Sequence, residues 1–135
     1  MDLNNLPVFR MMSGKMKWLA ERQTVLAKNV SNSDTPRYRP KELKEVDFTQ
    51  LEKANAFRVA LARTDPRHLA GSGAAVRFDA AGQRNPYETL PAGNAVVLEE
   101  QLAKVAENRH DYALMTQLYR KHIQMFRIAL GQRGQ

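Results

Sequence analysis

The sequence predicts a mainly α-helical protein whose two long terminal helices pair as a coiled coil, with an irregular or small β-containing middle segment. Two observations predict this fold: a helical apolar rhythm near each end, and the gathering of most prolines and glycines between the two ends. The absence of cysteine excludes a disulfide scaffold and thiol catalysis. We therefore divide the 135 residues into an N-terminal helix region (1–33), a Pro/Gly-rich middle (34–95) and a C-terminal helix region (96–135).

The N-terminal helix is expected from about Leu6 to Val30, because apolar residues recur there at steps of three and four. Gln23 is the one polar position in this narrow stripe, which is typical of a coiled-coil seam. The helix should stop in residues 31–36, which favour turns, and Pro36 disfavours a helical backbone at the residue before it.

The C-terminal helix is expected from about Val96 to Leu130, with the same rhythm broken by Arg109 and Thr116. Its apolar face is widened by Leu114, Met115, Leu118 and Met125.

Three signals predict the ends of this C-terminal helix. Asn94 is a predicted N-cap, and Glu99 and Glu100 suit the positive end of the helix dipole. Gly131 is a predicted stop. In the middle, 57–61 and 75–78 have the composition of short strands, and composition leaves a small irregular or β-rich insert and a flexible segment both open.

Two helices of about 40 and 50 Å bury only one seam between them, so their outer faces stay available to other chains. This favours an assembly subunit over the alternative, a monomeric hairpin packed on the middle segment. The predicted interface, within or between subunits, sets Phe9, Met12, Met16, Leu19 and Leu26 against Leu98, Leu102, Val105, Tyr112, Tyr119, Ile123 and Phe126.

Catalytic and metal-binding patterns are sparse. Residues 13–16 contain Gly-Lys without the other residues of a phosphate-binding loop, and the histidines 68, 110 and 122 lie far apart, with His122 expected to pack. We predict no enzyme activity, no cofactor and no metal. The sequence also has no apolar run long enough for a membrane span, and its first residues do not resemble a secretory signal peptide.

A net charge of +7 raises an alternative, a basic coiled-coil adaptor or a nucleic-acid-binding module. The basic residues Arg37, Arg39, Lys41 and Lys44 surround Tyr38, but Glu42, Glu45 and Asp47 dilute them. A solvated surface, or charge matching with a more acidic partner, explains this pattern better.

Residues 26–39, which join the first helix to the middle, resemble the signature of bacterial flagellar rod, hook and hook-associated proteins. The matching positions are Leu26, Ala27, Asn29, Val30, Asn32, Thr35, Pro36, Tyr38 and Arg39. Ser31 replaces the usual alanine, and Arg37 replaces a glycine suited to positive φ. The segments 44–48, 64–69, 93–102 and 106–112 narrow the resemblance to the proximal rod proteins.

This resemblance implies a structural component of the flagellar basal-body rod, the hollow drive shaft and export channel needed for motility. It implies rod-core helices at both ends, and as partners other copies, the rod protein FlgC, the adaptor FliE, and the export gate and basal ring. It also implies export into the periplasmic space by the flagellar type III apparatus. Asn29, Asn32 and Thr35 are then expected to hydrogen-bond the helix end and the turn, unless they form only a local helix stop.

Overall fold

The computed structural model describes residues 6–47, 78–82, 89, 91 and 93–131. Two helices and one small sheet make up this part of the chain, in the order α1 (Pro7–Ser31), β1 (Lys41–Leu43), β2 (Ala80–Gly82) and α3 (Leu98–Ala129). The predicted fold class, two long terminal helices with a small β-containing middle, is confirmed. The predicted strand at 57–61 and the motif at 64–69 lie outside the described residues, as does most of 75–78.

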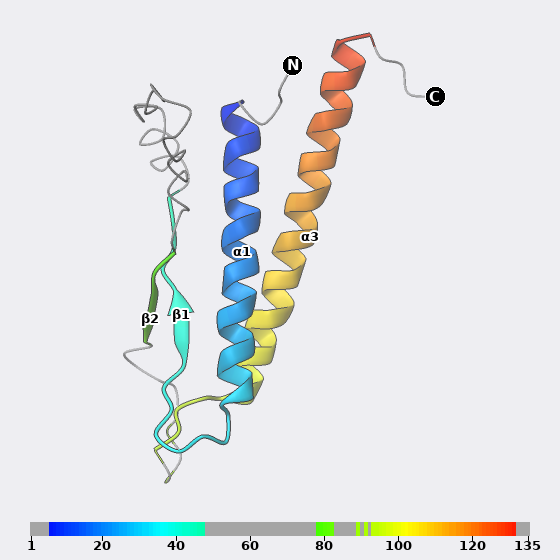
Figure 1. Ribbon diagram of the computed structural model, residues 1–135. Helices are drawn as coiled ribbons and strands as arrows, with labels where there is room; N and C mark the ends of the chain where they lie inside the picture. Colours follow the sequence, from blue (N-terminus) through cyan, green and yellow to red (C-terminus); the bar gives the residue numbers. More distant parts are fainter. Residues whose placement is uncertain (1–5, 48–77, 83–88, 90, 92, 132–135) are drawn as a thin grey trace, which may run out of the picture.

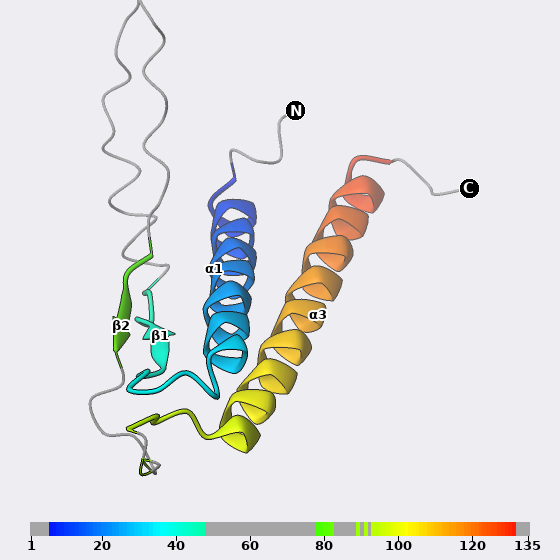
Figure 2. The ribbon, with the colours of Figure 1, turned by 60° about the horizontal axis from the view of Figure 1, so that its bottom comes forward.

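The helices α1 and α3 run antiparallel, and α3 continues beyond the start of α1 (Figure 1). The two strands lie along α1 on its other side, so that α1 is the middle layer between the sheet and α3 (Figure 2). Among described elements, α1 packs directly on both α3 and β1. One helix therefore carries both packing surfaces of the fold.

The start and end of α1 follow from local chemistry. Pro7 occupies the first turn, where its missing N–H is not needed, and Leu6 before it is extended. The helix ends at Ser31, where the backbone N–H of Asn32 bonds to the carbonyl of Asn29 over 3.1 Å and that of Ser33 to the carbonyl of Val30 over 3.2 Å. Lys28 in the last turn suits the negative end of the helix dipole.

The ends of α3 confirm two predicted signals and correct a third. Glu99 and Glu100 lie in its first turn, and Gly131 follows its end with φ of 76°, a conformation that favours glycine. The predicted N-cap at Asn94 is wrong, because α3 begins four residues later, at Leu98, with Val97 as an N-cap that makes no side-chain hydrogen bond. The side chain of Asn94 is instead engaged at the end of α1.

The sheet consists of two short antiparallel strands, with Lys41 opposite Gly82 and Leu43 opposite Ala80. A further backbone hydrogen bond from Lys44 N to Asp79 O, 3.0 Å, extends the pairing by one residue. The strand β1 lies inside the basic segment of the sequence, where three residues are too few to produce a periodic signal.

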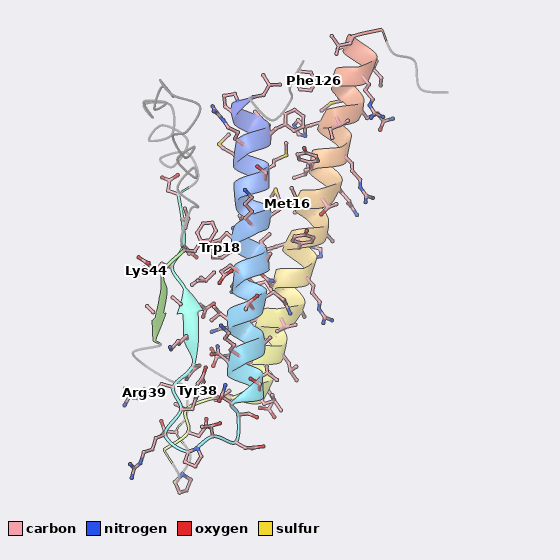
Figure 3. All side chains as sticks on the ribbon, in the orientation of Figure 1. Met16, Trp18, Tyr38, Arg39, Lys44 and Phe126 are labelled. Carbon is pink, nitrogen blue, oxygen red and sulfur yellow. The ribbon has the colours of Figure 1, made fainter. Side chains whose placement is uncertain are left out.

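The core lies mainly around α1. A cluster of Trp18, Leu19, Val25 and Leu43 is buried, with Val46, Phe78 and Met115 packed against it. The predicted apolar stripe of α1 does not include Trp18, which faces the sheet rather than α3. Its indole Nε1 donates to the carbonyl of Lys44 over 3.0 Å, which satisfies the one polar atom of this ring. Figure 3 shows Trp18 directed toward Lys44.

Candidate functional site

The signature residues form a tight turn at the end of α1. The side-chain amide of Asn32 donates to the carbonyl of Lys28 over 2.7 Å, and the Thr35 hydroxyl donates to Asn32 Oδ1 over 3.1 Å. The backbone N–H of Thr35 also bonds to the carbonyl of Asn32, at 3.1 Å. The first and third of these bonds satisfy the carbonyls of Lys28 and Asn32, which the helix end leaves without intrahelical partners.

The next turn places Pro36 at its second position and Arg37 at its third, and the Tyr38 N–H closes it on the Thr35 carbonyl at 3.3 Å. Arg37 has φ of 59°, as the third residue of a type II turn requires. A backbone conformation that favours glycine is therefore adopted by an arginine. Gly93, at φ of 80°, packs against Arg37, since a Cβ there would lie 3.4 Å from Arg37 Cγ.

Asn29 is the centre of the junction, the region where the end of α1, the turn after it, β1 and the start of α3 meet. It is 1% exposed. Its Nδ2 donates to Lys41 O (2.7 Å) and to Gln101 Oε1 (2.9 Å). Its Oδ1 accepts from Lys41 N (2.9 Å) and from the Tyr38 hydroxyl (3.2 Å). One amide thus has all its donors and acceptors in use and joins α1, the turn, β1 and α3.

Asn94 makes a second link between the two helices, although sequence reasoning gave it another role. Its Nδ2 lies within hydrogen-bond distance of the carbonyls of Asn32 (3.0 Å), Ser33 (2.6 Å) and Thr35 (2.7 Å), and its Oδ1 accepts from Val96 N (2.8 Å). The approach to α3 is therefore attached to the end of α1 by a side chain that is 2% exposed.

Aromatic rings pack between α1 and α3 at the end of the helix pair opposite the junction. The Phe9 ring lies 5.2 Å from that of Tyr119 in an edge-to-face arrangement and 5.6 Å from that of Phe126. His122 also faces Phe9, at 6.5 Å between ring centroids, and its Nδ1 bonds to the carbonyl of Leu118. Figure 3 shows Phe126 at this end and Met16 between the two helices.

In the half of the α1–α3 seam away from these aromatic rings, α3 contributes buried polar side chains. Gln101 meets Asn29, and Asn108 Nδ2 donates to Leu19 O and to Gln23 Oε1, both at 3.0 Å. Gln101 and Asn108 are almost fully buried. Sequence reasoning missed both as seam residues because it sought apolar positions, although their spacing of seven is a coiled-coil signal.

The predicted interface residues fall into three groups by their exposure in this chain. Phe9, Met12, Leu19 and Leu26 are buried, and Met16, Val105, Tyr119, Ile123 and Phe126 are half-buried. The remaining three are exposed on α3: Leu98 (41%), Leu102 (53%) and Tyr112 (45%). The α1–α3 pair leaves further large apolar side chains exposed, namely Val8, Leu114, Met125, Ile128 and Leu130. Such a set is typical of a surface that another chain covers.

An ion-pair network ties β1 to both helices through Glu42. Its carboxylate bonds to Arg22 at 2.9 Å and to Lys104 at 2.7 Å. Burial alone raises the pKa of Glu42, but the hydrogen bonds and positive charges of Lys104 and Arg22 outweigh burial, so this pKa lies below its ordinary value. Burial likewise opposes the charged form of Lys104, but Glu100 and Glu42 raise its pKa.

This network also changes the interpretation of the basic segment. Glu42 lies among the basic residues and forms ion pairs with one cation from each helix. The surface of this segment is therefore not uniformly positive. Arg37 and Arg39 are exposed near the turn. In the described part of the chain, no group of three potential metal ligands gathers, and no helix has the length and hydropathy of a membrane span.

Comparison with known proteins agrees with the signature. The chain is similar to the flagellar basal body rod protein FlgB of Agrobacterium fabrum, with 31% identity over 128 residues, 92% of each chain. It is 26% identical over 98 residues to FlgB of Bacillus subtilis, across 71% of each chain. It is 28% identical over 102 residues to FlgB of Escherichia coli, across 70% of this chain and 72% of the relative. A scan against models of protein families finds no match. The relatives nevertheless show that the chain belongs to the FlgB family of flagellar basal body rod proteins.

Proposed function

We propose that this chain is a structural subunit of the proximal flagellar rod and assembles through its terminal helices. Membership of the FlgB family makes it a structural component of the basal-body rod. The regions 1–33 and 96–135 are the rod-core helices, and 34–95 is the segment between them. Copies pack these helices around a hollow channel that serves as drive shaft and export path.

One structural observation carries the proposal: α3 remains apolar on faces that α1 does not cover. Leu102 is 53% exposed and Ile128 is 62% exposed, and they lie far apart along one helix. Burying one such side chain stabilises by about 1.5–3 kcal/mol, so contacts repeated along a shaft can hold it without covalent links. The exposed Leu98, Leu102 and Tyr112 are the proposed contacts with neighbouring rod subunits.

The junction supports the proposal because it fixes one helix relative to the other. Asn29 and Asn94 fasten the end of α1 to the start of α3 through buried hydrogen bonds. A subunit that transmits torque needs a helix pair that does not slide. In the proposed role, the signature residues are therefore more than a helix stop: they hold the pair in the register that its neighbours meet.

The proposal extends to partners, location and chemistry. The partners are other copies, the rod protein FlgC and the adaptor FliE, with the export gate and basal ring at the base. The subunit acts in the periplasmic space after export by the flagellar type III apparatus. It has no enzymatic role and uses no cofactor.

The test is a Leu102→Asp strain, scored for motility, export of the subunit and its presence in purified basal bodies. Because Leu102 is exposed in the single chain, we expect the variant to fold and be exported but to be absent from the rod, and the cells to be non-motile. Gln117→Asp is the matched control, with the same charge change at another exposed site on α3, and should swim.

A second variant separates assembly from folding. Leu19 is fully buried in the seam, so Leu19→Asp should lower the helix content of the isolated chain, whereas Leu102→Asp should not. Normal motility and normal rod content in the Leu102→Asp strain would show that this face makes no contact needed for assembly.

A further inference from the structure

The charges of α3 are divided between its two halves. Residues 98–111 hold four acidic and two basic side chains, whereas residues 112–129 hold three basic side chains and no acidic one, with histidine counted as neutral. The three cations of the second half, Arg120, Lys121 and Arg127, are all exposed. One half of this helix is therefore acidic overall and the other half is basic.

The helix α1 does not neutralise the basic half of α3. The ring centroids of Phe9 and Tyr119 lie 5.2 Å apart, so the first half of α1 lies beside the second half of α3. Residues 7–20 of α1 hold three basic side chains and no acidic one. Both helices thus bring positive charge to this end of the pair, where an acidic group from another chain would be attracted.

The helix dipole accounts for only part of this division. Its effect is confined to the first and last turns of a helix, where it explains the acidic start of α3 and Arg127 near its end. Glu107, Arg120 and Lys121 lie more than two turns from either end of α3, so the dipole does not explain them.

The charges lie on the outer face of α3, which we define by two rows of residues at heptad spacing: 99, 106, 113, 120 and 127, and 100, 107, 114, 121 and 128. Gln101 and Asn108 face α1, and the residues one and two positions before each of them lie about 100° and 200° around the helix. Nine of these ten residues are exposed, and Glu100 is half-buried. The sheet does not cover this face, because α1 lies between the sheet and α3 (Figure 2).

The spacing of these charges fits a second copy that is displaced along the helix. Each acid of the outer face is followed by a cation after nearly the same number of residues, namely 20 from Glu100 to Arg120, 22 from Glu99 to Lys121 and 20 from Glu107 to Arg127. The two members of each pair lie on different rows, as do the flanking charges that meet between parallel helices. At 1.5 Å per residue, one displacement of about 30 Å brings the three acids of one copy beside the three cations of the next.

We propose that copies of this chain pack through the outer faces of α3, parallel and displaced by about 30 Å, so that the acidic half of one copy meets the basic half of the next. The inference rests on the assembly role proposed above, because copies along a shaft point the same way, and it adds the face and the displacement. Such a contact does not close on itself, so it continues from copy to copy along an open helix. Residues 110–118 stay outside the overlapping stretches, which agrees with Gln117 as a control site.

The test is sedimentation velocity of the purified full chain at low and high salt. We expect association that grows beyond a dimer with concentration, and that weakens at least about tenfold between roughly 0.02 M and 0.5 M salt. Lys121→Glu should weaken association at low salt by about tenfold or more, because it sets a carboxylate beside Glu99 of the next copy. Lys17→Glu is the matched control, with the same charge change at an exposed site on α1, and should change association less than about twofold. Circular dichroism of both variants should match that of the parent chain, because both lysines are exposed.

A charge swap identifies the orientation of the two copies. In the proposed parallel pair, adding Glu99→Lys to the Lys121→Glu chain should restore association, whereas adding Glu107→Lys should not. In an antiparallel pair the acidic and basic halves match without displacement, and Lys121 meets Glu107 instead. Rescue by Glu107→Lys and not by Glu99→Lys would therefore overturn the proposal.

Three other results would also overturn it. These are a chain that stays monomeric at low salt, association that salt does not weaken, and equal loss in the Lys121→Glu and Lys17→Glu chains. The Leu102→Asp strain tests assembly in the cell, whereas the charge variants test one contact between copies. A monomeric chain together with an assembly-deficient Leu102→Asp strain would refute this contact and leave the proposed rod role standing.

Discussion

Replacing Asn29 with alanine should destabilise the whole junction, because this one amide connects four parts of the fold. The substitution removes both bonds to the backbone of Lys41, the bond to Gln101 and the bond to Tyr38. The groups at Lys41 and Gln101 would then be left in an interior where water reaches poorly, since Asn29 and Gln101 are each 1% exposed.

The magnitude follows from the hydrogen bonds at this site. A hydrogen bond of this kind contributes a net amount of about 1 kcal/mol, so four bonds give an upper figure of about 4 kcal/mol. Tyr38 is only half-buried, so its hydroxyl can turn to water, and alanine improves helix propensity by about 0.6 kcal/mol. We therefore expect unfolding to become easier by about 2–3 kcal/mol. With a urea dependence of about 2 kcal/mol per molar, the midpoint should fall by roughly 1 M.

The assay is urea unfolding of the full chain followed by far-ultraviolet circular dichroism. Asn32→Ala is the matched control, because Asn32 lies three residues later but is more exposed. The hydrogen bonds of its side-chain amide with Lys28 and Thr35 stay close to the turn. This control should lose less than about 1 kcal/mol. Equal losses in the two variants, or a loss below about 1 kcal/mol for Asn29→Ala, would refute the role of Asn29 as the centre of the junction.

Two further predictions concern the turn and the ion network. Arg37→Gly should raise the free energy of unfolding by about 0.5–1 kcal/mol, because glycine adopts φ of 59° without the side-chain penalty; urea midpoints test this, and a lower midpoint would contradict it. Glu42→Gln should cost about 1 kcal/mol near neutral pH, and the difference from the parent chain should disappear under acid conditions. The sign follows from the lowered pKa of Glu42: its stabilisation is complete above the ordinary pKa of 4.5 and is lost as pH falls through the folded-state value. Unfolding midpoints from pH about 3 to 8 test this, and a pH-independent difference would count against the network.

The apolar stripe of α1 was predictable because it depends only on the spacing of apolar residues along one helix. Phe9, Met12, Leu19 and Leu26 repeat at heptad spacing, and all four are buried. The predicted stripe of α3 differs from the observed seam because α3 is apolar over a wide angle. Of two possible stripes, the one with Leu98 and Leu102 is more apolar, but Gln101 and Asn108 face α1.

The reason for this choice lies outside α3 itself. Asn29 and Gln23 lie on α1 and need polar partners once they are enclosed, and Gln101 and Asn108 supply them. Periodicity counts apolar residues one helix at a time and cannot register a hydrogen bond between residues 72 positions apart. The same limit applies to Asn94, whose partners lie about 60 positions away, so its local pattern suggested a helix cap.

By itself, the sequence determined that this protein has two long helices, where the first one ends, and the family to which its signature belongs. Those features rest on local spacing, on turn chemistry around Pro36 and on a short motif, all of which are written in consecutive residues. The tertiary structure decided which face of α3 meets α1, how Asn29 and Asn94 lock the junction, and that Trp18 faces the sheet. These outcomes depend on giving buried polar side chains such as Asn29 and Asn94 partners that are distant in the sequence, and only the folded chain brings those partners together.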